Sequence, residues 1–566
     1  MKKISKCSSD FKLPPDLVDW EKEYRHFTWE KTKEELGWGK KDRFNASYFA
    51  LERNATNFNK NKIALYWEGE DGEKKKFTFN ELNALACQFA NLLRRYGVEK
   101  GERVFFFLPR IPQFYFGFLG TLKTGAVAGT LFSAFGSGAL FDRLNDAGAK
   151  ILVTDKELVK RVKPIDRKLK RLEKIILVEE LEELLKHEKT TFKTTKVKPD
   201  EPAFMLYTSG TTGKPKGVVH AHQAILLQYQ TAKWVLDIHP EDVYWCTADP
   251  GWVTGIAYSI LGSWAMGTSS LIYSGRFEPE KWYQLIQDYK VTIWYTAPTA
   301  IRMLMAKGKD LVKKYDSSSL RHLCSVGEPL NPECVFWGKQ AFGLPFHDNW
   351  WQTETGGILI ANYPSMDIKP GSMGRPIPGV KAGIVNDKGQ ELGLKQIGNL
   401  AIRPGWPSMM KTIWHRPAKY KSYFKDGWYI TGDLAYKDKN GYFWFVGRAD
   451  DVIKTSGERV GPFEVESSLI EHHSVVEAGV IGKPDALRGQ IVKAFVVLKP
   501  SVRPSEALKA QLQQYVKTHL AGHAYPREIE FIDKLPKTRS GKIMRRVLKA
   551  KELGLPVGDT STLEEY

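Results

Sequence analysis

The stretch AFMLYTSGTTGKPKG, residues 203–217, decides the fold and points to a ligand. The apolar run AFML predicts a buried strand, and it leads directly into a loop dense in hydroxyls, glycines and lysines. Hydroxyls donate hydrogen bonds, glycines let backbone amides approach an anion, and lysines add positive charge. We interpret the loop as a polyphosphate clamp made by Thr208, Ser209, Gly210, Thr211, Thr212, Gly213, Lys214 and Lys216.

This loop is not a Walker A motif. That motif requires Ser or Thr directly after its lysine, whereas Pro215 follows Lys214 here. The phosphate contacts must therefore follow a different design.

Segments around the loop alternate between helix and strand patterns. FTFNELNALACQFANLLRRYG (77–97) predicts a capped amphipathic helix, RVFFFLP (103–109) a buried strand, and QFYFGFLGTLKTG (113–125) another helix. Such alternation predicts parallel sheets covered by helices, with ligands at the strand ends. The same rhythm returns in KILVTD (150–155), KIILVEE (174–180), VTIWYTAP (291–298) and LRHLCSVGEPL (320–330).

The pattern changes after Gly371 to short alternating strands with glycine turns, such as 379–393 and 426–448, which predict a small β subdomain. A further helix and strand series runs from 462 to 536. We therefore predict an α/β protein. Its large N-terminal domain, 1–449, has two α/β sheet subdomains and a small β subdomain, and a mobile α+β C-terminal domain spans 450–566.

The formal charge of +19 raises the question of a nucleic-acid or membrane partner. Lysines and arginines are spread along the whole chain without an RNA-binding aromatic signature or zinc-finger spacing, which argues against nucleic acid. The five cysteines are scattered and show no C-x-x-C pair, and no apolar run reaches the length of a membrane span. We expect a cytoplasmic protein that binds small molecules and no membrane, as a monomer or small homo-oligomer.

The phosphate loop and five further segments, in this order, resemble the adenylate-forming superfamily of acyl-CoA synthetases, luciferases and peptide-synthetase adenylation domains. The resemblance covers about Trp20 to the C-terminus. The other segments are SVGEPLNPE (325–333), HDNWWQTETG (347–356), YITGD (429–433), GRADDVIKTSGERVGPFEVE (447–466) and PKTRSGKIMRR (536–546).

The resemblance implies roles for residues around ATP. Asp433 would accept the ribose hydroxyls, Arg448 would contact ribose or phosphate, and Glu354 would hold Mg²⁺ to offset the triphosphate charge. Asn349 stands where relatives commonly carry Thr, a departure that bears on one expected hydrogen bond. The expected walls of the adenine and phosphate site are Gly327, Glu328, Pro329, Asp348, Asn349, Trp350, Trp351, Gln352 and Thr353.

Lys542 is the expected catalytic cation, acting with Glu354 and Thr208. It would reach the substrate carboxylate and the α-phosphate during adenylation and stabilise the charge of the transition state. Acetylation would remove that charge, so a lysine acetyltransferase and deacetylase acting on Lys542 are possible partners.

The resemblance also implies a second step with coenzyme A after a swing of the C-terminal domain about Asp450. Gly457 would let pantetheine pass, and Lys517, where relatives often have Arg, would bind the nucleotide of coenzyme A less specifically. The expected coenzyme A residues are Ser456, Gly457, Glu458, Arg459, Arg488 and Lys517. A structural Mg²⁺ on the backbone carbonyls of Ile470, His472 and Val475 is also implied.

The expected acyl pocket consists of Val253, Thr254, Val326 and Trp351. Trp351 would fill the space of longer chains, so acetate is favoured, with propionate next. We expect an acetate–CoA ligase that forms AMP. The alternatives are a propionate or medium-chain acyl-CoA synthetase and a non-catalytic nucleotide-binding protein. A peptide-synthetase adenylation domain is disfavoured, because no carrier module follows Lys542.

Overall fold

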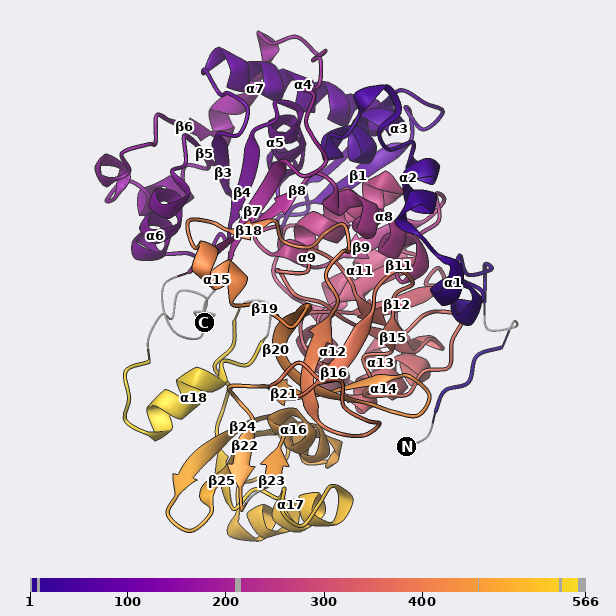
Figure 1. The fold of residues 1–566 in the computed structure, drawn as a ribbon, viewed down its shortest axis with the longest axis vertical. Helices are drawn as coiled ribbons and strands as arrows, with labels where there is room; N and C mark the ends of the chain where they lie inside the picture. Colours follow the sequence, from indigo (N-terminus) through magenta and orange to yellow (C-terminus); the bar gives the residue numbers. More distant parts are fainter. Residues whose placement is uncertain (1–2, 8–10, 209–214, 457, 539–541, 558–566) are drawn as a thin grey trace.

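The computed structural model describes residues 3–7, 11–208, 215–456, 458–538 and 542–557. In Figure 1 the chain forms a large body above and a smaller C-terminal unit below, which begins after β21 (Phe443–Arg448) and runs from α16 (Pro462–Glu471) to α18 (Arg545–Glu552). The α/β class and the division into a large part with two α/β sheets, a small β sheet and an α+β C-terminal part confirm the prediction from sequence. No described helix is long and apolar enough to cross a membrane.

One α/β sheet carries the phosphate-loop strand. That strand is β7. In this sheet the strands β6, β5, β3, β4 and β7 pair in parallel, and β8 turns back antiparallel to β7. The strands in spatial order are β18 (Thr412–Ile413), β8 (Lys216–Ala221), β7 (Pro202–Thr208), β4 (Val127–Leu131), β3 (Arg103–Phe107), β5 (Ile151–Thr154) and β6 (Lys174–Leu177).

The second α/β sheet is parallel in its middle and antiparallel at both edges. The polar segments that follow β12 and β13 therefore leave the sheet at one edge, where open α/β sheets place ligands. In spatial order its strands are β15 (Arg375–Pro376), β14 (Ile360–Ala361), β13 (Phe346–Trp350), β12 (His322–Ser325), β11 (Ile293–Thr296), β9 (Val243–Cys246), β10 (Ser269–Tyr273), β1 (Ile63–Glu68) and β2 (Lys74–Thr78).

Helices pack against both α/β sheets (Figure 1). The amphipathic helix expected after Phe77 is α4, where the Thr78 hydroxyl and the Glu81 carboxylate form a capping box. The helices of the large part are α1 (Trp20–His26), α2 (Trp29–Leu36), α3 (Arg53–Ala55), α4 (Phe79–Arg95), α5 (Pro112–Lys123), α6 (Ser137–Ala147), α7 (Val178–Lys186), α8 (Ala224–Trp234), α9 (Val253–Ile256), α10 (Gly262–Ala265), α11 (Pro279–Asp288), α12 (Pro298–Lys307), α13 (Lys309–Val312), α14 (Pro332–Phe342) and α15 (Pro417–Lys421).

Two smaller sheets complete the fold. The antiparallel β subdomain contains β16 (Ala382–Val385), β17 (Gly398–Ile402), β20 (Trp428–Lys437), β19 (Phe424–Lys425) and β21 (Phe443–Arg448). The C-terminal sheet contains β23 (Glu458–Val460), β22 (Ile453–Thr455), β25 (Gly489–Leu498), β24 (Val475–Asp485) and β26 (Glu528–Phe531), next to α16 (Pro462–Glu471), α17 (Glu506–His519) and α18 (Arg545–Glu552).

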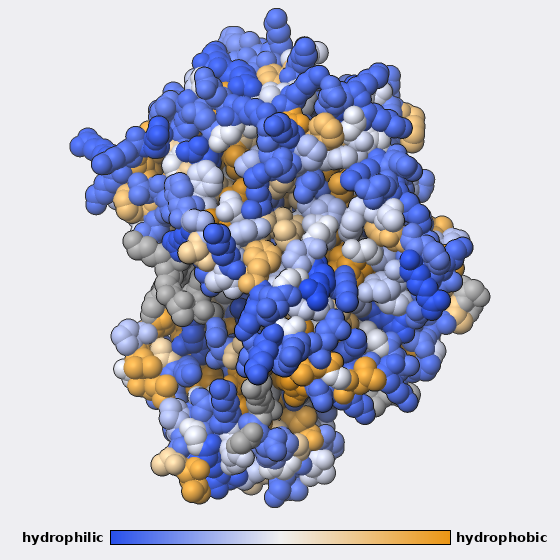
Figure 2. All heavy atoms as spheres, in the orientation of Figure 1, coloured by the Kyte–Doolittle hydropathy of each residue, from blue (hydrophilic) through white to orange (hydrophobic). Residues whose placement is uncertain are grey.

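The surface seen in Figure 2 is mostly hydrophilic, with small scattered apolar patches. The exposed large apolar side chains, such as Phe58 and Leu487, belong to different parts of the chain. Scattered apolar side chains are normal for a folded protein and mark no interface by themselves.

Gly374 provides a stability test of the contact between β14 and β15. Its φ is +89°, and a Cβ atom would lie 1.9 Å from the Ala361 carbonyl oxygen. We expect Gly374→Ala to lower the free energy of unfolding by about 2–5 kcal/mol, the sum of backbone strain and overpacking. Urea unfolding followed by tryptophan fluorescence measures this change.

Gly138→Ala in α6 is the matched control. Gly138 has no neighbour within 4 Å of its Cβ position. Because alanine favours a helix over glycine, this variant should be neutral or stabilised by up to about 1 kcal/mol. Equal unfolding midpoints for the two variants would contradict the predicted clash.

Candidate functional site

Strands β7 and β8 hold the two ends of the phosphate loop side by side. Thr208 at the end of β7 pairs with Lys216 at the start of β8. The Thr208 hydroxyl is buried and has no hydrogen-bond partner among the described residues. A buried hydroxyl without a partner is costly, so it suits an anion at this position. The predicted clamp residues Ser209, Gly210, Thr211, Thr212, Gly213 and Lys214 lie outside the described residues.

Tyr423 connects the loop to the predicted magnesium ligand. Its hydroxyl accepts a hydrogen bond from Lys216 Nζ at 2.7 Å and donates one to Glu354 Oε1 at 3.1 Å. Lys216 Nζ lies 4.0 Å from the same carboxylate oxygen. Burial lowers the pKa of Lys216, although the Glu354 carboxylate opposes this effect. Tyr423 thus holds the Lys216 ammonium and the Glu354 carboxylate together at the end of the phosphate loop.

The carboxylate of Asp433, in β20, is the centre of a second group of interacting side chains. It accepts hydrogen bonds from Arg448 Nη1 at 2.8 Å, Trp350 Nε1 at 2.9 Å and Gln352 Nε2 at 3.0 Å. Burial raises the pKa of Asp433, and the Arg448 guanidinium opposes that shift. Three donors fix the orientation of the carboxylate, as binding of a diol requires.

Lys542 comes to this group from the C-terminal unit. Its backbone N–H donates to the Thr538 hydroxyl at 3.2 Å, and its carbonyl accepts from the Thr538 N–H at 2.9 Å. The residue is exposed by surface area. Desolvation, followed by the Arg448 charge, lowers the pKa of Lys542, whereas the Asp433 charge raises it. The predicted catalytic lysine therefore lies within electrostatic reach of the predicted ribose ligand.

The segments predicted to wall the adenine and phosphates lie at the carboxyl ends of β12 and β13. Gly327 has a φ of +97°, and a Cβ atom added there would have no neighbour within 4 Å. Gln352 accepts a hydrogen bond from the Tyr429 hydroxyl at 2.8 Å, and Thr353 presents its carbonyl to His220. Pro329 is half-buried next to Glu328. These placements are compatible with the predicted roles, which stay predictions.

Three side chains of these segments turn toward protein groups. The Asn349 amide donates to the Ser325 carbonyl at 2.9 Å and accepts from the Tyr295 hydroxyl at 2.9 Å. Asp348 is buried and accepts the Asn349 N–H at 3.0 Å, and burial raises its pKa. Glu328 pairs with Arg302 at 2.9 Å. All three side chains therefore have a hydrogen-bond or ionic partner within the protein.

The predicted acyl residues lie at the start of α9 and directly after β12 and β13. Val253, Thr254 and Val326 are buried, and Trp351 packs against the apolar clusters that contain Val253 and Val326. The Trp351 ring stands edge to face with Tyr258 at 5.3 Å between centroids. Its Nε1 donates to the Tyr295 hydroxyl at 3.4 Å. The indole is thus held in one place, as a pocket floor requires.

His220 and Tyr423 support the site, and sequence reasoning missed both. The two ring nitrogens of His220 lie 2.8 Å from the Thr353 carbonyl and 3.1 Å from the Ser408 carbonyl. Burial lowers the pKa of His220 to about 4, so the ring is neutral at pH 7 and donates through one nitrogen. It sits in an apolar strand, and Tyr423 lies in a basic loop, so neither carries a motif signal.

The predicted hinge and coenzyme A residues follow β21 or lie in the C-terminal unit. Asp450 is exposed directly after β21. Ser456, with a φ of +51°, and Glu458 belong to the β22–β23 turn, and the Ser456 N–H donates to the Arg488 carbonyl at 3.0 Å. Lys517 is exposed on α17, at the lower end of the molecule in Figure 1. Gly457 lies outside the described residues, and of Arg459 only the backbone is described.

The predicted carbonyl site for a second Mg²⁺ lies between α16 and β24. Ile470 is in α16 and Val475 begins β24. The His472 carbonyl accepts the Val475 N–H at 3.0 Å, so one of the three expected ligands already has a partner. This site stays a prediction.

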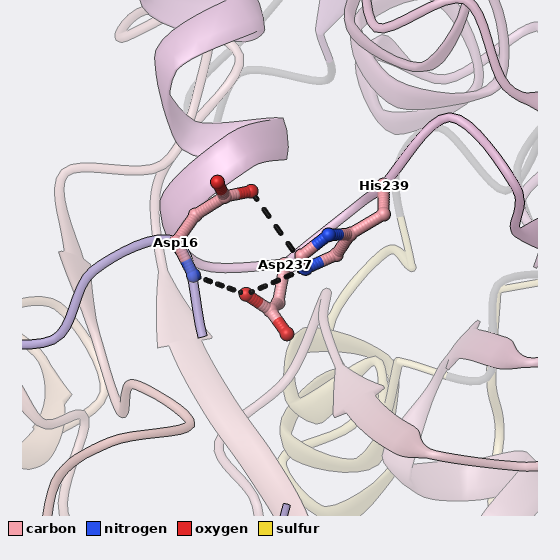
Figure 3. Close-up of side chains that lie close together, drawn as sticks. All are labelled: Asp16, Asp237 and His239. Carbon is pink, nitrogen blue, oxygen red and sulfur yellow. Dashed lines mark hydrogen bonds and ion pairs between the residues drawn. The ribbon is translucent and has the colours of Figure 1, made fainter. Parts of the chain in front are cut away.

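Asp16, Asp237 and His239 form a cluster of possible metal ligands that sequence reasoning did not foresee (Figure 3). Asp237 accepts the Asp16 N–H at 2.9 Å and pairs with Arg321 at 2.7 Å. His239 Nε2 lies 3.6 Å from Asp237 Oδ1, and the hydrogen bond to Asp237 raises its pKa. Because Arg321 already neutralises Asp237, we interpret the cluster as an anchor for the N-terminal segment.

Two sequence families match the chain: AMP-binding enzyme over residues 51–414 and AMP-binding enzyme C-terminal domain over residues 464–542. The chain belongs to the AMP-binding enzyme family. The predicted boundary between residues 449 and 450 falls between the two matched ranges. It stays a prediction, because neither range reaches it.

Relatives of this AMP-binding enzyme include two proteins named acetyl-coenzyme A synthetase. The one from Bacillus subtilis is 54% identical, covering 97% of this chain and 98% of the relative. The one from Methanothrix thermoacetophila is 41% identical, covering 96% and 88%.

Similar solved structures are those of the anthranilate CoA ligase AuaEII with anthranoyl-AMP and of ATP-bound MatB from Rhodopseudomonas palustris. The first has a TM-score of 0.84 and 32% identity, covering 90% of this chain and 97% of that chain. The second has a TM-score of 0.81 and 27% identity, covering 90% and 99%.

Tyr423→Phe tests the link between Lys216 and Glu354. The variant keeps the ring and removes both hydrogen bonds to charged groups. We expect the Kd for ATP in the presence of Mg²⁺ to rise about tenfold, the effect of about 1.5 kcal/mol. Isothermal titration calorimetry measures this directly.

Tyr420→Phe is the control, because the Tyr420 hydroxyl makes no side-chain hydrogen bond within the described part of the chain and its ring packs on Phe424. It should bind ATP as the wild type does. An unchanged Kd in Tyr423→Phe would show that this hydroxyl does not order the nucleotide site.

Proposed function

We propose that the chain is an acetate–CoA ligase that forms AMP. It converts ATP, acetate and coenzyme A into acetyl-CoA, AMP and diphosphate through an acetyl-adenylate. The observation that carries the proposal is 54% identity over 97% of the chain to an acetyl-coenzyme A synthetase. The convergence of Thr208, Glu354, Asp433 and Lys542 supports it, since these are the groups that adenylation of a carboxylate needs.

In the first half-reaction an acetate oxygen attacks the α-phosphorus of ATP and diphosphate leaves. The Thr208 hydroxyl and Lys216 bind the phosphates, and Asp433 accepts the ribose hydroxyls. Glu354 would hold Mg²⁺, which when bound offsets the negative charge of the triphosphate. Lys542 stabilises the charge that develops between the carboxylate and the α-phosphate.

In the second half-reaction the thiol of coenzyme A attacks the carbonyl carbon of the acetyl-adenylate and AMP leaves. The charge of Lys542 acts on Asp433 from the C-terminal unit. This is the arrangement that the first half-reaction needs. A swing about Asp450 would then withdraw Lys542 and bring Ser456 and Glu458 to the pocket.

The acyl pocket favours acetate over longer carboxylates. Trp351 is held by Tyr258 and Tyr295 and packs against the apolar clusters that contain Val253 and Val326. A pocket separates substrates by about 1–3 kcal/mol per methylene, so propionate is the expected second substrate. The medium-chain alternative requires this indole to move.

Acetate-dependent exchange of diphosphate into ATP tests the proposed function. We expect acetate to give the highest kcat/KM, then propionate, with little exchange on butyrate. Trp351→Gly should raise the butyrate-to-acetate ratio of kcat/KM at least about tenfold, because one or two methylenes then fit. If wild-type enzyme prefers butyrate or hexanoate, the assignment to acetate is wrong.

Lys542→Ala separates catalysis from nucleotide binding. We expect diphosphate exchange to fall about 10²–10³-fold, while conversion of supplied acetyl-adenylate by coenzyme A stays near the wild-type rate. Acetyl-lysine at position 542 should act in the same way, because it also removes the charge. Full exchange activity in Lys542→Ala would favour a different catalytic group or a protein that only binds nucleotide.

The other expectations rest on the same family membership. We infer a cytoplasmic protein without a nucleic-acid or membrane partner, acting as a monomer or small homo-oligomer. The coenzyme A nucleotide would bind Arg488 and Lys517, and Lys542 would be the site of a lysine acetyltransferase and deacetylase.

A further inference from the structure

The C-terminal unit contacts the large domain through buried polar groups next to the site. The Asn331 amide, before α14, donates to the Ser467 hydroxyl of α16 at 2.8 Å, and both residues are buried. Buried polar groups pair specifically, so such contacts define one relative placement of the two units. Charged side chains beside this contact restrict the relative placement of the two units further.

Arg302 in α12 is the cation of this interface. Its Nη2 donates to Glu328 at 2.9 Å and to Thr299 at 2.7 Å, and its Nη1 donates to Asn331 at 3.0 Å. The remaining nitrogen, Nε, is buried and faces Glu477 Oε1 of the C-terminal unit at 3.9 Å. Burial lowers the pKa of Arg302, but the carboxylates of Glu328 and Glu477 outweigh this and raise it.

Glu477 connects this cation to the loop that carries Lys542. Both of its carboxylate oxygens accept from Lys537 Nζ at 2.5 Å. Lys537 in turn forms a backbone bridge with Ile543, the neighbour of Lys542. A hydrogen-bonded path therefore runs from Glu477 of β24 to the residues that flank the catalytic lysine.

The charges on the two sides are balanced separately. Arg302 has Glu328 within the large domain, and Glu477 has Lys537 within the C-terminal unit. Breaking a buried ion pair is costly mainly because it leaves one charge unpaired. Separation of Arg302 from Glu477 leaves each ion with its own partner, so this contact can form and break in every catalytic cycle.

We propose that Glu477 is a positioning residue that holds the C-terminal unit in the adenylating arrangement, by pairing with Arg302 and by orienting the Lys542 loop through Lys537. This inference rests on the proposed two-step function. Glu477 acts through Lys542 and Arg302, and it contacts no substrate.

Glu477→Gln tests this role, because it removes the charge and keeps the shape. We expect kcat for acetate-dependent diphosphate exchange to fall at least tenfold while KM for ATP stays within twofold. Conversion of supplied acetyl-adenylate by coenzyme A should stay within twofold of wild type, since that step does not use the docked arrangement. This second rate also shows that the variant is folded.

Three further variants complete the test. Glu530→Gln removes an exposed partner of Lys493 within the same C-terminal sheet and should change neither half-reaction. Ser467→Ala removes one neutral contact and should slow exchange a few-fold, again without affecting the second step. Glu477→Asp keeps the charge and should recover exchange to within fivefold of wild type.

The outcomes separate the two proposals. No exchange with wild-type protein and any carboxylate would overturn the proposed function itself. Active wild type with equal rates in Glu477→Gln would overturn the positioning role. Equal loss of both half-reactions would do the same, because it would make Glu477 a general structural residue.

Discussion

The buried carboxylate of Asp433 joins the parts of the molecule that must act together. Trp350 and Gln352 reach it from the segment after β13, and Arg448 reaches it from the last strand before the C-terminal unit. The charge of Lys542 acts on it from that unit. A carboxylate in the protein interior requires partners of fixed geometry. Satisfying this one brings the second α/β sheet, the β subdomain and the C-terminal unit to a single site.

The site and the domain interface use charge in two ways. At the site, Lys216, Arg448 and Lys542 are cations of the kind that a polyanion needs. At the interface, the ion pairs Arg302–Glu328 and Lys537–Glu477 are each complete within one unit. The gathered cations of the site are stabilised when the anionic substrate binds. The interface can open without leaving a charge unpaired, as a two-step reaction at one site demands.

Sequence motifs predicted most residues of the candidate site. The structure identified further residues that belong to no motif. The loop after β7, Asp433, Trp351 and Lys542 are recognisable because the residue types and their order match the family. His220, Tyr423 and Glu477 are not, since a histidine in an apolar strand or a glutamate in a charged chain is common. Their partners lie far away in the sequence, and only folding brings them within hydrogen-bond distance.

The amino-acid sequence by itself determined the strand–helix alternation, the phosphate loop and the family, because periodicity reports burial and a loop's chemistry is local. The tertiary structure decided which side chains of the motifs face the site. It turns Asn349 and Glu328 toward protein partners and packs Trp351 against the apolar cluster that contains Val253. It also brought the charge of Lys542, from the C-terminal unit, within reach of Asp433. Both outcomes depend on burial and on charge pairing between distant segments, which no local pattern encodes.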